Sequence, residues 1–273
     1  MDIKRYMKAL PAVAALLLTA ACSSSEDIET VETPQPAKER IIHFTAKVNN
    51  EDATRATLDG TQYNFVSGDK LYVWGTNISG ELTTTNSGTY ATFEGDLTYT
   101  GTGEPGTITL NAVVKGARDQ ILGSFADFET RGHVPSYTNG IASDKTDAVE
   151  KCSFLKATHD NCVLSGDNPS CSFEPSQESA FITFDITLED GTAAGENITV
   201  TVNNNSSAVC SGSVKTVKVG DAIKAQFTAA FPGGTQLSGA TVTLGARTPI
   251  SFASSNPKLT ANKNYTVTKS YTR

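Results

Sequence analysis

The apolar residues of this chain alternate with polar ones in short runs that are separated by turn residues. In the run FITFDITL, residues 181–188, four apolar side chains share one face: Ile182, Phe184, Ile186 and Leu188. A period of two is typical of a strand with one buried face. Similar runs recur along the chain with Gly, Asn or Asp between them, and no long window shows a helical period. We therefore predict an all-β chain built from β-sandwiches.

The best internal boundary is the stretch SGDNPSCSFEPSQESA at residues 165–180. It contains two prolines and many small polar residues, and new strand patterning begins directly after it. With 38% hydrophobic and 19% charged residues, the 273-residue chain has the composition of a globular protein. We predict an N-terminal β-sandwich domain at 41–168 and a C-terminal one at 169–273, each of a common domain size.

The first residues have the pattern of an export signal. A basic start is followed by an apolar run that is too short to span a bilayer, and small residues then lead to Cys22. We predict a lipoprotein signal peptide at 1–21, with Cys22 lipidated and forming the new N-terminus. The alternative is an ordinary secretory signal that contains a cysteine. Residues 22–40 are rich in Ser, Glu and Pro, which predicts a flexible tether.

The formal net charge is −7, and there is no basic run in the chain after its start. Nucleic acid is therefore not an expected partner. Four cysteines follow the signal: Cys152, Cys162, Cys171 and Cys210. An exported chain can form disulfides, and four cysteines allow three pairings among which the sequence does not choose. Free buried thiols stay an alternative, and no metal site is predicted because there is no CxxC motif.

Candidate catalytic residues do not form a known constellation. The chain has three histidines and contains no HExxH, GxSxG or phosphate-binding glycine loop. His159 lies close to Cys162, but a cysteine nucleophile needs a base that the fold positions, so we interpret this stretch as a polar loop. Asp69 in SGDKLYVWG is interpreted as part of a turn that leads into a strand. We predict no enzyme and no cofactor.

The predicted first strand is IIHFTAKV, residues 41–48. One face is entirely apolar and consists of Ile42, Phe44, Ala46 and Val48. A polar stretch with a single basic residue, Arg55, follows before the next apolar run. A protease can reach an arginine in such a stretch.

These features together resemble the fimbrillin-like lipoproteins of Bacteroidales, the subunits of type V pili. The matching motifs are the lipoprotein signal with its acidic tether, IIHFTAKV followed by ATRATLDGTQYNF, SGDKLYVWG, the junction DNPSCSF to SAFITFDITL, and the closing KLTANKNYTVT. They cover most of the mature chain. The resemblance implies two transthyretin-like β-sandwich domains, and export as a lipoprotein to the outer membrane and the fimbrium at the cell surface.

The resemblance also implies an assembly mechanism. A lipid anchor holds the precursor, and an arginine-specific protease cuts after the arginine that follows the first strand, which is Arg55 here. The strand then leaves, and a donor strand from another pilus subunit fills the groove. Arg40 is the alternative cleavage site, but it precedes the strand, so cleavage there leaves the groove filled.

The C-terminus departs from the pattern of stalk subunits, because only about nine residues follow Asn264. Tyr265, Val267 and Tyr271 fit a last domain strand or a donor strand. A tip, cap or anchor subunit, or a family member that does not polymerise, is therefore favoured over a stalk subunit, and an anchor would keep its lipid. The alternative function is a glycan-binding surface lipoprotein, with sugars stacking on scattered tyrosines: Tyr90, Tyr99, Tyr137 and Tyr271.

Overall fold

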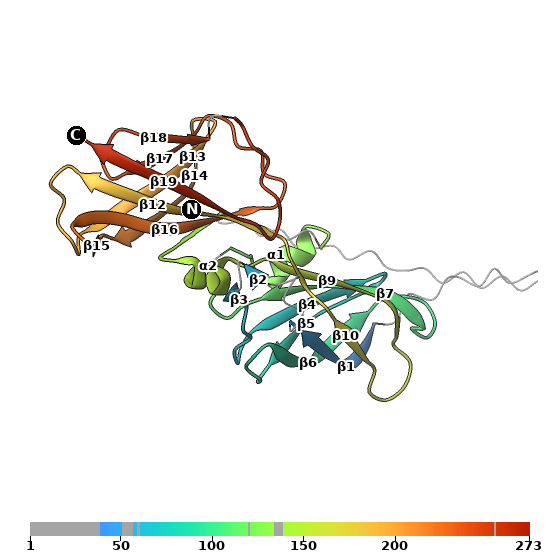
Figure 1. Ribbon diagram of the computed structural model, residues 1–273. Helices are drawn as coiled ribbons and strands as arrows, with labels where there is room; N and C mark the ends of the chain where they lie inside the picture. The colour runs from blue at the N-terminus through green and yellow to red at the C-terminus, as the bar shows by residue number, and fades with distance from the viewer. Residues whose placement is uncertain (1–38, 51–56, 59–60, 120, 134–138, 254) are drawn as a thin grey trace, which may run out of the picture. The chain divides into compact units, whose positions relative to one another are not determined.

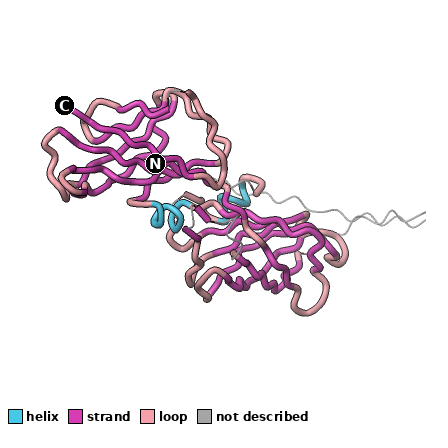
Figure 2. The backbone as a smooth tube through the Cα atoms, in the orientation of Figure 1, coloured by secondary structure: helices cyan, strands magenta, loops and turns pink. Residues whose placement is uncertain are grey.

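Strands make up most of the structure, as Figure 2 shows in magenta. The computed structural model describes residues 39–50, 57–58, 61–119, 121–133, 139–253 and 255–273. Contacts group Ala37–Arg273 into one compact unit. The all-β class predicted from the period-two alternation is confirmed.

The first half of the chain forms a curved sheet, whose strands are labelled in Figure 1. In the described residues its order is β10 (Ser170–Phe173), β1 (Arg40–Asn49), β6 (Tyr90–Tyr99), β5 (Ile78–Thr84), β4 (Lys70–Gly75), β7 (Thr107–Lys115), β9 (Leu155–Val163) and β11 (Ser176–Gln177). Neighbours are antiparallel except β10 and β1, which are parallel. A single apolar cluster lies inside it, and its largest fully buried side chains include Phe44, Phe65, Phe93, Phe173, Leu71, Leu82 and Leu97.

The second half forms two facing sheets. One has the order β15 (Val217–Val219), β16 (Ala222–Pro232), β12 (Ser179–Glu189) and β19 (Asn264–Thr272), and β8 (Gly140–Ala142) also pairs with β16. The other has the order β14 (Ser207–Lys215), β13 (Asn197–Asn204), β17 (Ala240–Leu244) and β18 (Ile250–Ala253). The alternating apolar side chains of both sheets meet in a second cluster, as expected of a sandwich. A small ribbon, β2 (Thr57–Leu58) and β3 (Thr61–Gln62), stands apart from these sheets.

Two helices, which the sequence analysis did not predict, lie in the connection between β7 and β9. They are α1 (Phe125–Thr130) and α2 (Lys145–Cys152), and both are too short to produce a clear helical period. Ser124 caps α1 in a capping box with Asp127, and the Asp144 side chain caps α2 by accepting from the backbone of Asp147. The described part of the chain contains no helix that is long and apolar enough to cross a membrane.

The chain passes from the first sheet to the second later than the boundary predicted between residues 168 and 169. β10 and β11 belong to the first sheet, and β12 opens the second at Ser179. Cys171 and Phe173 are apolar residues of the first cluster, which holds this segment there despite its prolines and polar residues. β1 begins at Arg40, which is the last residue of the predicted tether. The division into two domains stays a prediction.

We expect F44A to lower the free energy of unfolding by about 3–5 kcal/mol, because Phe44 is fully buried and its removal leaves a cavity. Denaturant unfolding followed by circular dichroism measures this loss. I41A is the matched control, since Ile41 lies in the same strand with 63% of its surface exposed, and its effect should stay near 0.5 kcal/mol. Similar losses in both variants would contradict the assignment of the buried face.

Candidate functional site

The candidate site is β1 with the strands on its two sides. β1 pairs antiparallel with β6 along its whole length, from Arg40 opposite Tyr99 to Asn49 opposite Tyr90. On its other side, residues 45–48 pair in parallel with residues 170–173 of β10. The C-terminal half of β1 is therefore an interior strand of the sheet, while within the described residues its N-terminal half pairs with β6 alone.

One face of β1 points into the first core. Phe44, Ala46 and Val48 have no exposed surface, and Ile42 is partly buried against the same cluster. These four residues are the ones that the alternation assigns to a single face. Burying a large apolar side chain stabilises a fold by about 1.5–3 kcal/mol. The strand therefore contributes substantially to the first core as well as to the sheet.

The side chains across β1 and β6 are complementary in size. The opposed pairs are Phe44 with Gly95, Ala46 with Phe93, and Val48 with Ala91. A side chain at Gly95 would bring its Cβ to 2.9 Å from the carbonyl oxygen of Glu81 and 3.1 Å from a methyl group of Leu82, so this position needs glycine. Directly opposed side chains of an antiparallel pair lie on the same face of the sheet and compete for space. The inward positions 44, 46 and 48 of β1 therefore accept a large, a small and a medium side chain, in that order.

A groove of about 290 Å³ lies beside the N-terminal half of β1. It is lined by residues 40–43, 104–105, 164–167 and 169. Arg40 forms an ion pair with Glu104 at 2.5 Å, and His43 Nδ1 lies 3.1 Å from Asp96. These groups are mostly solvent-exposed, so the contacts hold this end of β1 only weakly.

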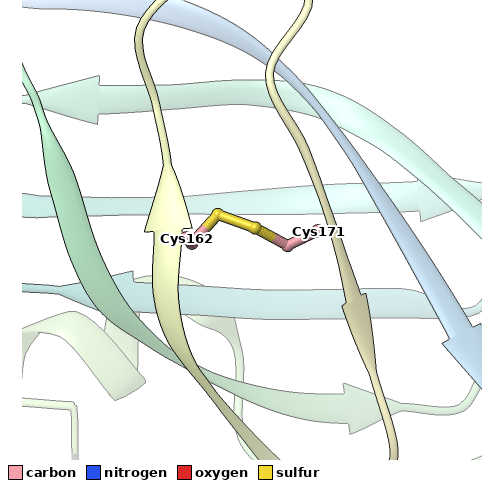
Figure 3. Close-up of a disulfide and its surroundings, with 2 residues drawn as sticks. All are labelled: Cys162 and Cys171. Carbon is pink, nitrogen blue, oxygen red and sulfur yellow. A yellow bond between two sulfur atoms is a disulfide. The ribbon is translucent and has the colours of Figure 1, made fainter.

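A disulfide joins Cys162 of β9 to Cys171 of β10, with the two Cα atoms 6.1 Å apart (Figure 3). Since β9 and β10 lie near opposite ends of the sheet order, the bond fastens the sheet where it folds back around its core. It holds β10 in place independently of the β10–β1 hydrogen bonds. It also occupies Cys162, which therefore cannot act as a nucleophile, and His159 lies in β9 rather than in a loop.

The structure thus chooses one pairing among the alternatives that the sequence left open. Cys152 and Cys210 are free thiols inside the protein, and burial raises the pKa of each to about 12. Both are accordingly in the unreactive thiol form at neutral pH. In the part of the chain that the structure describes, no group of three His, Cys, Asp or Glu side chains could hold a metal ion.

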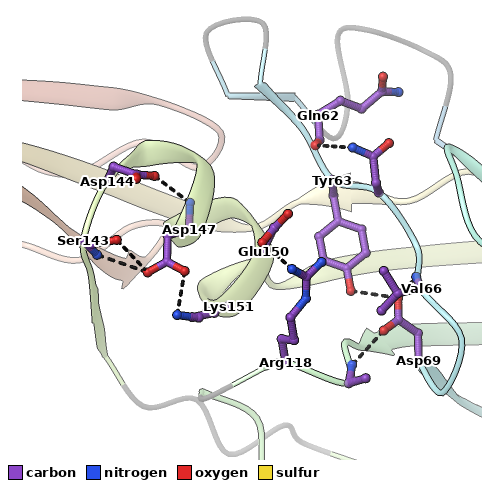
Figure 4. A network of polar contacts seen from close by, with 12 residues as sticks. Gln62, Tyr63, Val66, Asp69, Arg118, Ser143, Asp144, Asp147, Glu150 and Lys151 are labelled. Atoms are coloured by element: carbon purple, nitrogen blue, oxygen red, sulfur yellow. Dashed lines mark hydrogen bonds and ion pairs between the residues drawn. The ribbon is translucent and has the colours of Figure 1, made fainter.

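Tyr63 and Asp69, which precede β4, take part in a network of polar contacts that Figure 4 shows. Asn50 donates from its side chain to the carbonyl of Tyr63 at 2.6 Å, and the Tyr63 hydroxyl donates to Asp69 at 3.0 Å. Asp69 is fully buried and also accepts from the backbone of Val66 and Ala117. Burial, followed by the neighbouring Asp69, raises the pKa of the Tyr63 hydroxyl above its usual value. Asp69 thus has the structural role in a turn that the sequence predicts.

Two predicted site residues lie outside the described residues. They are Cys22 and Arg55, and the lipidation and cleavage assigned to them stay predictions. The described residues nearest to Arg55 are Asn50 on one side and Thr57 on the other. Cleavage between these two would cut the direct connection from β1 to the rest of the chain.

The last strand, β19, lies parallel to β12 at the end of the second sheet. Its C-terminal end is fastened by Arg247, whose guanidinium lies 5.8 Å from the ring centre of Tyr271 and donates to Asp190 at 2.6 Å. Hydrogen bonds from Arg247 and Thr192 lower the pKa of Asp190 to about 2. β19 therefore pairs with a strand of its own chain. This agrees with a last domain strand rather than a donor strand, the two alternatives considered for Tyr265, Val267 and Tyr271.

The three described tyrosines considered for glycan binding are not brought together. Tyr90 is 45% exposed and Tyr99 is buried at the opposite end of β6, while Tyr271 lies in β19 of another sheet. Tyr137 lies outside the described residues. Trp74 is partly buried and packs against the rings of Phe128 and His133. Among the described residues, these positions do not form a shared stacking platform.

Solved structures similar to this chain include adhesion and fimbrial proteins. A candidate cell adhesion protein of Bacteroides ovatus is 13% identical, with a TM-score of 0.42 over 85% of this chain and 92% of that chain. A fimbrial assembly protein of Parabacteroides distasonis is 10% identical, with a TM-score of 0.38 over 85% and 92%. The tip fimbrial protein of Porphyromonas gingivalis is 10% identical, with a TM-score of 0.32 over 78% and 82%. No protein-family model and no curated protein matches the chain.

We expect the double variant C162S/C171S to lower the free energy of unfolding by about 2–3 kcal/mol, since the bond closes a short loop with a sequence separation of 9. Denaturant midpoints with and without a thiol reductant measure the loss. Reduction should destabilise the wild-type protein by a similar amount and leave the variant unchanged. A variant that still responds to reductant would show that another cysteine pair carries the effect.

Asp190 should make stability sensitive to acid. Because its folded pKa lies below the ordinary value of 3.8, the stabilisation is present above that value and is lost as pH falls toward about 2. We expect the urea unfolding midpoint of R247Q to fall less between pH 5 and pH 2 than that of the wild-type protein. R131Q removes the same charge from an exposed helix end and should keep the wild-type slope. Equal slopes in R247Q and wild type would contradict the role of the ion pair.

Proposed function

We propose that this chain is a non-enzymatic, structural and adhesive subunit of a cell-surface fimbria, exported as a lipoprotein through Cys22. In this proposal an arginine-specific protease cuts after Arg55, β1 leaves with its lipid, and a strand of another subunit takes its place. The observation that carries the proposal is the position of β1. It fills an apolar slot between β6 and β10, and its connection to the rest of the fold contains Arg55.

Strand replacement follows from the physical chemistry of that slot. Without β1, the backbone groups of β6 and β10 that face it would have no partner, and the core around Phe44, Ala46 and Val48 would be open to water. Both defects favour addition of an extended segment. The disulfide keeps β10 near its place, so the slot keeps two walls after β1 has gone.

The placement of Arg40 favours Arg55 as the maturation site. Arg40 is the first residue of β1 and pairs with Tyr99 of β6. Cleavage after Arg40 would release the lipid but leave the buried face of β1 in the core. Only cleavage after β1 frees the strand itself. The pairing of β19 with β12 at the edge of its own sheet favours a tip, cap or anchor subunit over a stalk subunit that extends a donor strand.

We expect limited digestion of the purified full chain with an arginine-specific protease to yield a product that begins at Ala56. The fragment that contains β1 should stay bound after cleavage, because its pairing with β6 and β10 is intact. Intact mass spectrometry under native and denaturing conditions measures both results. R55Q is the matched variant and should lose this product while retaining cuts at other arginines. Cleavage after Arg40 with residues 51–56 left intact would contradict the proposal.

A further inference from the structure

On the basis of the proposed function, we propose that Asn50 determines the direction in which a strand lies in the slot of β1. The slot then takes an extended segment that carries a side-chain amide on its buried face, two residues beyond the last of three apolar side chains. This requirement concerns the sequence of the occupant. It holds for β1 itself as well as for a strand that replaces it.

The buried face of β1 continues one step beyond the strand and ends on a polar residue. Phe44, Ala46 and Val48 have no exposed surface. Asn50 is the next residue of the same alternation and is 2% exposed. Its backbone N–H donates to the carbonyl of Thr89 at 2.8 Å, which extends the pairing with β6 past the end of β1. The inward series therefore consists of three apolar side chains followed by an amide.

The side-chain amide of Asn50 makes a contact that few other residues could supply. Its Nδ2 donates to the backbone carbonyl of Tyr63 at 2.6 Å. The backbone N–H of Asn50 donates to Thr89, and its carbonyl accepts from the side chain of Gln62, so these two bonds do not depend on the side chain at position 50. Without a donor there, the carbonyl of the buried Tyr63 would lose this partner, which is costly inside a core.

The Tyr63 carbonyl is positioned by contacts from outside β1. The Tyr63 hydroxyl donates to the fully buried Asp69 at 3.0 Å. Two residues further along the chain, Phe65 and Gly88 exchange two backbone hydrogen bonds, at 2.8 and 3.0 Å. None of these contacts uses a residue of β1, so the acceptor does not depend on the strand for its position.

The sizes of the inward side chains leave the direction of the strand open. Ala46 in the middle lies opposite Phe93, while the side chains on either side of it lie opposite a glycine and an alanine. A strand turned end to end about Ala46 keeps the small residue in the middle and exchanges only Phe44 and Val48. The slot also has one antiparallel wall, β6, and one parallel wall, β10, so both directions find backbone partners.

The amide removes this ambiguity. In a reversed strand Ile42 would take the place of Asn50 and leave the Tyr63 carbonyl without a donor. Asn50 would in turn take the place of Ile42, which packs against the apolar cluster. Both changes are unfavourable. Single buried polar residues select one arrangement of otherwise apolar helices in coiled coils in the same way.

The test is a cross-linking measurement on the full chain after cleavage at Arg55, at a urea concentration below unfolding. Three synthetic peptides of residues 40–51 are compared: the wild-type sequence, N50L, and the exchange I42N/N50I. The exchange keeps the composition of the peptide and moves the amide to its other end. R55Q protein, treated with the protease in parallel, is the control and should cross-link to none of the peptides.

The position of the cross-link reports the direction of the peptide. Every peptide also carries H43C, and each chain carries either D96C or Y90C. In the observed direction residue 43 lies opposite residue 96, whereas a reversed strand brings it to the position of Asn49, opposite residue 90. As the two thiols join, oxidised glutathione takes up their two electrons and is released as two thiols. The free cysteines of the chain are buried and do not compete.

We expect the wild-type peptide to cross-link to D96C at least about tenfold more than to Y90C, as measured by mass spectrometry. I42N/N50I should reverse this preference, and N50L should cross-link at both positions. If I42N/N50I keeps the preference for D96C, or cross-links at neither position, the inference is overturned and strand replacement stands. Failure of the wild-type peptide to exchange would overturn the proposed function, and the inference with it.

The uncleaved chain supplies a second readout that does not depend on the proposed function. N50D keeps the shape of Asn50 but replaces its donor with an oxygen that faces the Tyr63 carbonyl. We expect the equilibrium constant of unfolding to rise at least about tenfold at neutral pH, as measured in urea. K47Q changes an exposed residue of the same strand and should stay within about twofold. Wild-type stability in N50D would contradict the inference, because the amide would then hold nothing.

Discussion

The burial of one face of β1 is the interaction on which the first half of the molecule depends. Phe44, Ala46 and Val48 lie completely inside the core, and the size of each is matched by the residue opposite it on β6. A shift of one residue along the sheet would turn this face to solvent, and a shift of two would place Phe44 opposite Phe93 and lose the match with Gly95. The register of β1 is therefore fixed by packing as well as by backbone hydrogen bonds.

Two further features hold the surroundings of β1 without help from β1. The Cys162–Cys171 disulfide fastens β10 to β9, and the buried Asp69 holds the turn before β4 by accepting three hydrogen bonds. A strand that contributes so much to a core would normally be inseparable from it. The disulfide would hold the β10 wall of the slot in place if β1 left, and the proposed function uses that property.

The sequence predicted best those features that depend on the residues of a single strand or turn. It placed the apolar face of β1 correctly, identified the strand at Phe181–Leu188 within β12, and assigned Asp69 to a turn. It did not find α1 and α2, which are too short for a helical period, or the pairing of β10 with β1, since four residues carry too little pattern. The assignment of residues 169–177 to the second half followed their prolines and polar residues, whereas Cys171 and Phe173 hold them in the first core.

The sequence by itself determined the all-β class, the inward faces of the strands at residues 41–48 and 181–188, and the presence of Arg55 after the first of them, because these depend on neighbours along the chain. Only the tertiary structure decided that β10 lies beside β1, that Cys162 pairs with Cys171, and that large and small side chains alternate across β1 and β6. Each of these depends on which distant strands become neighbours. That choice is made by the packing of the whole core, which no local pattern of residues contains.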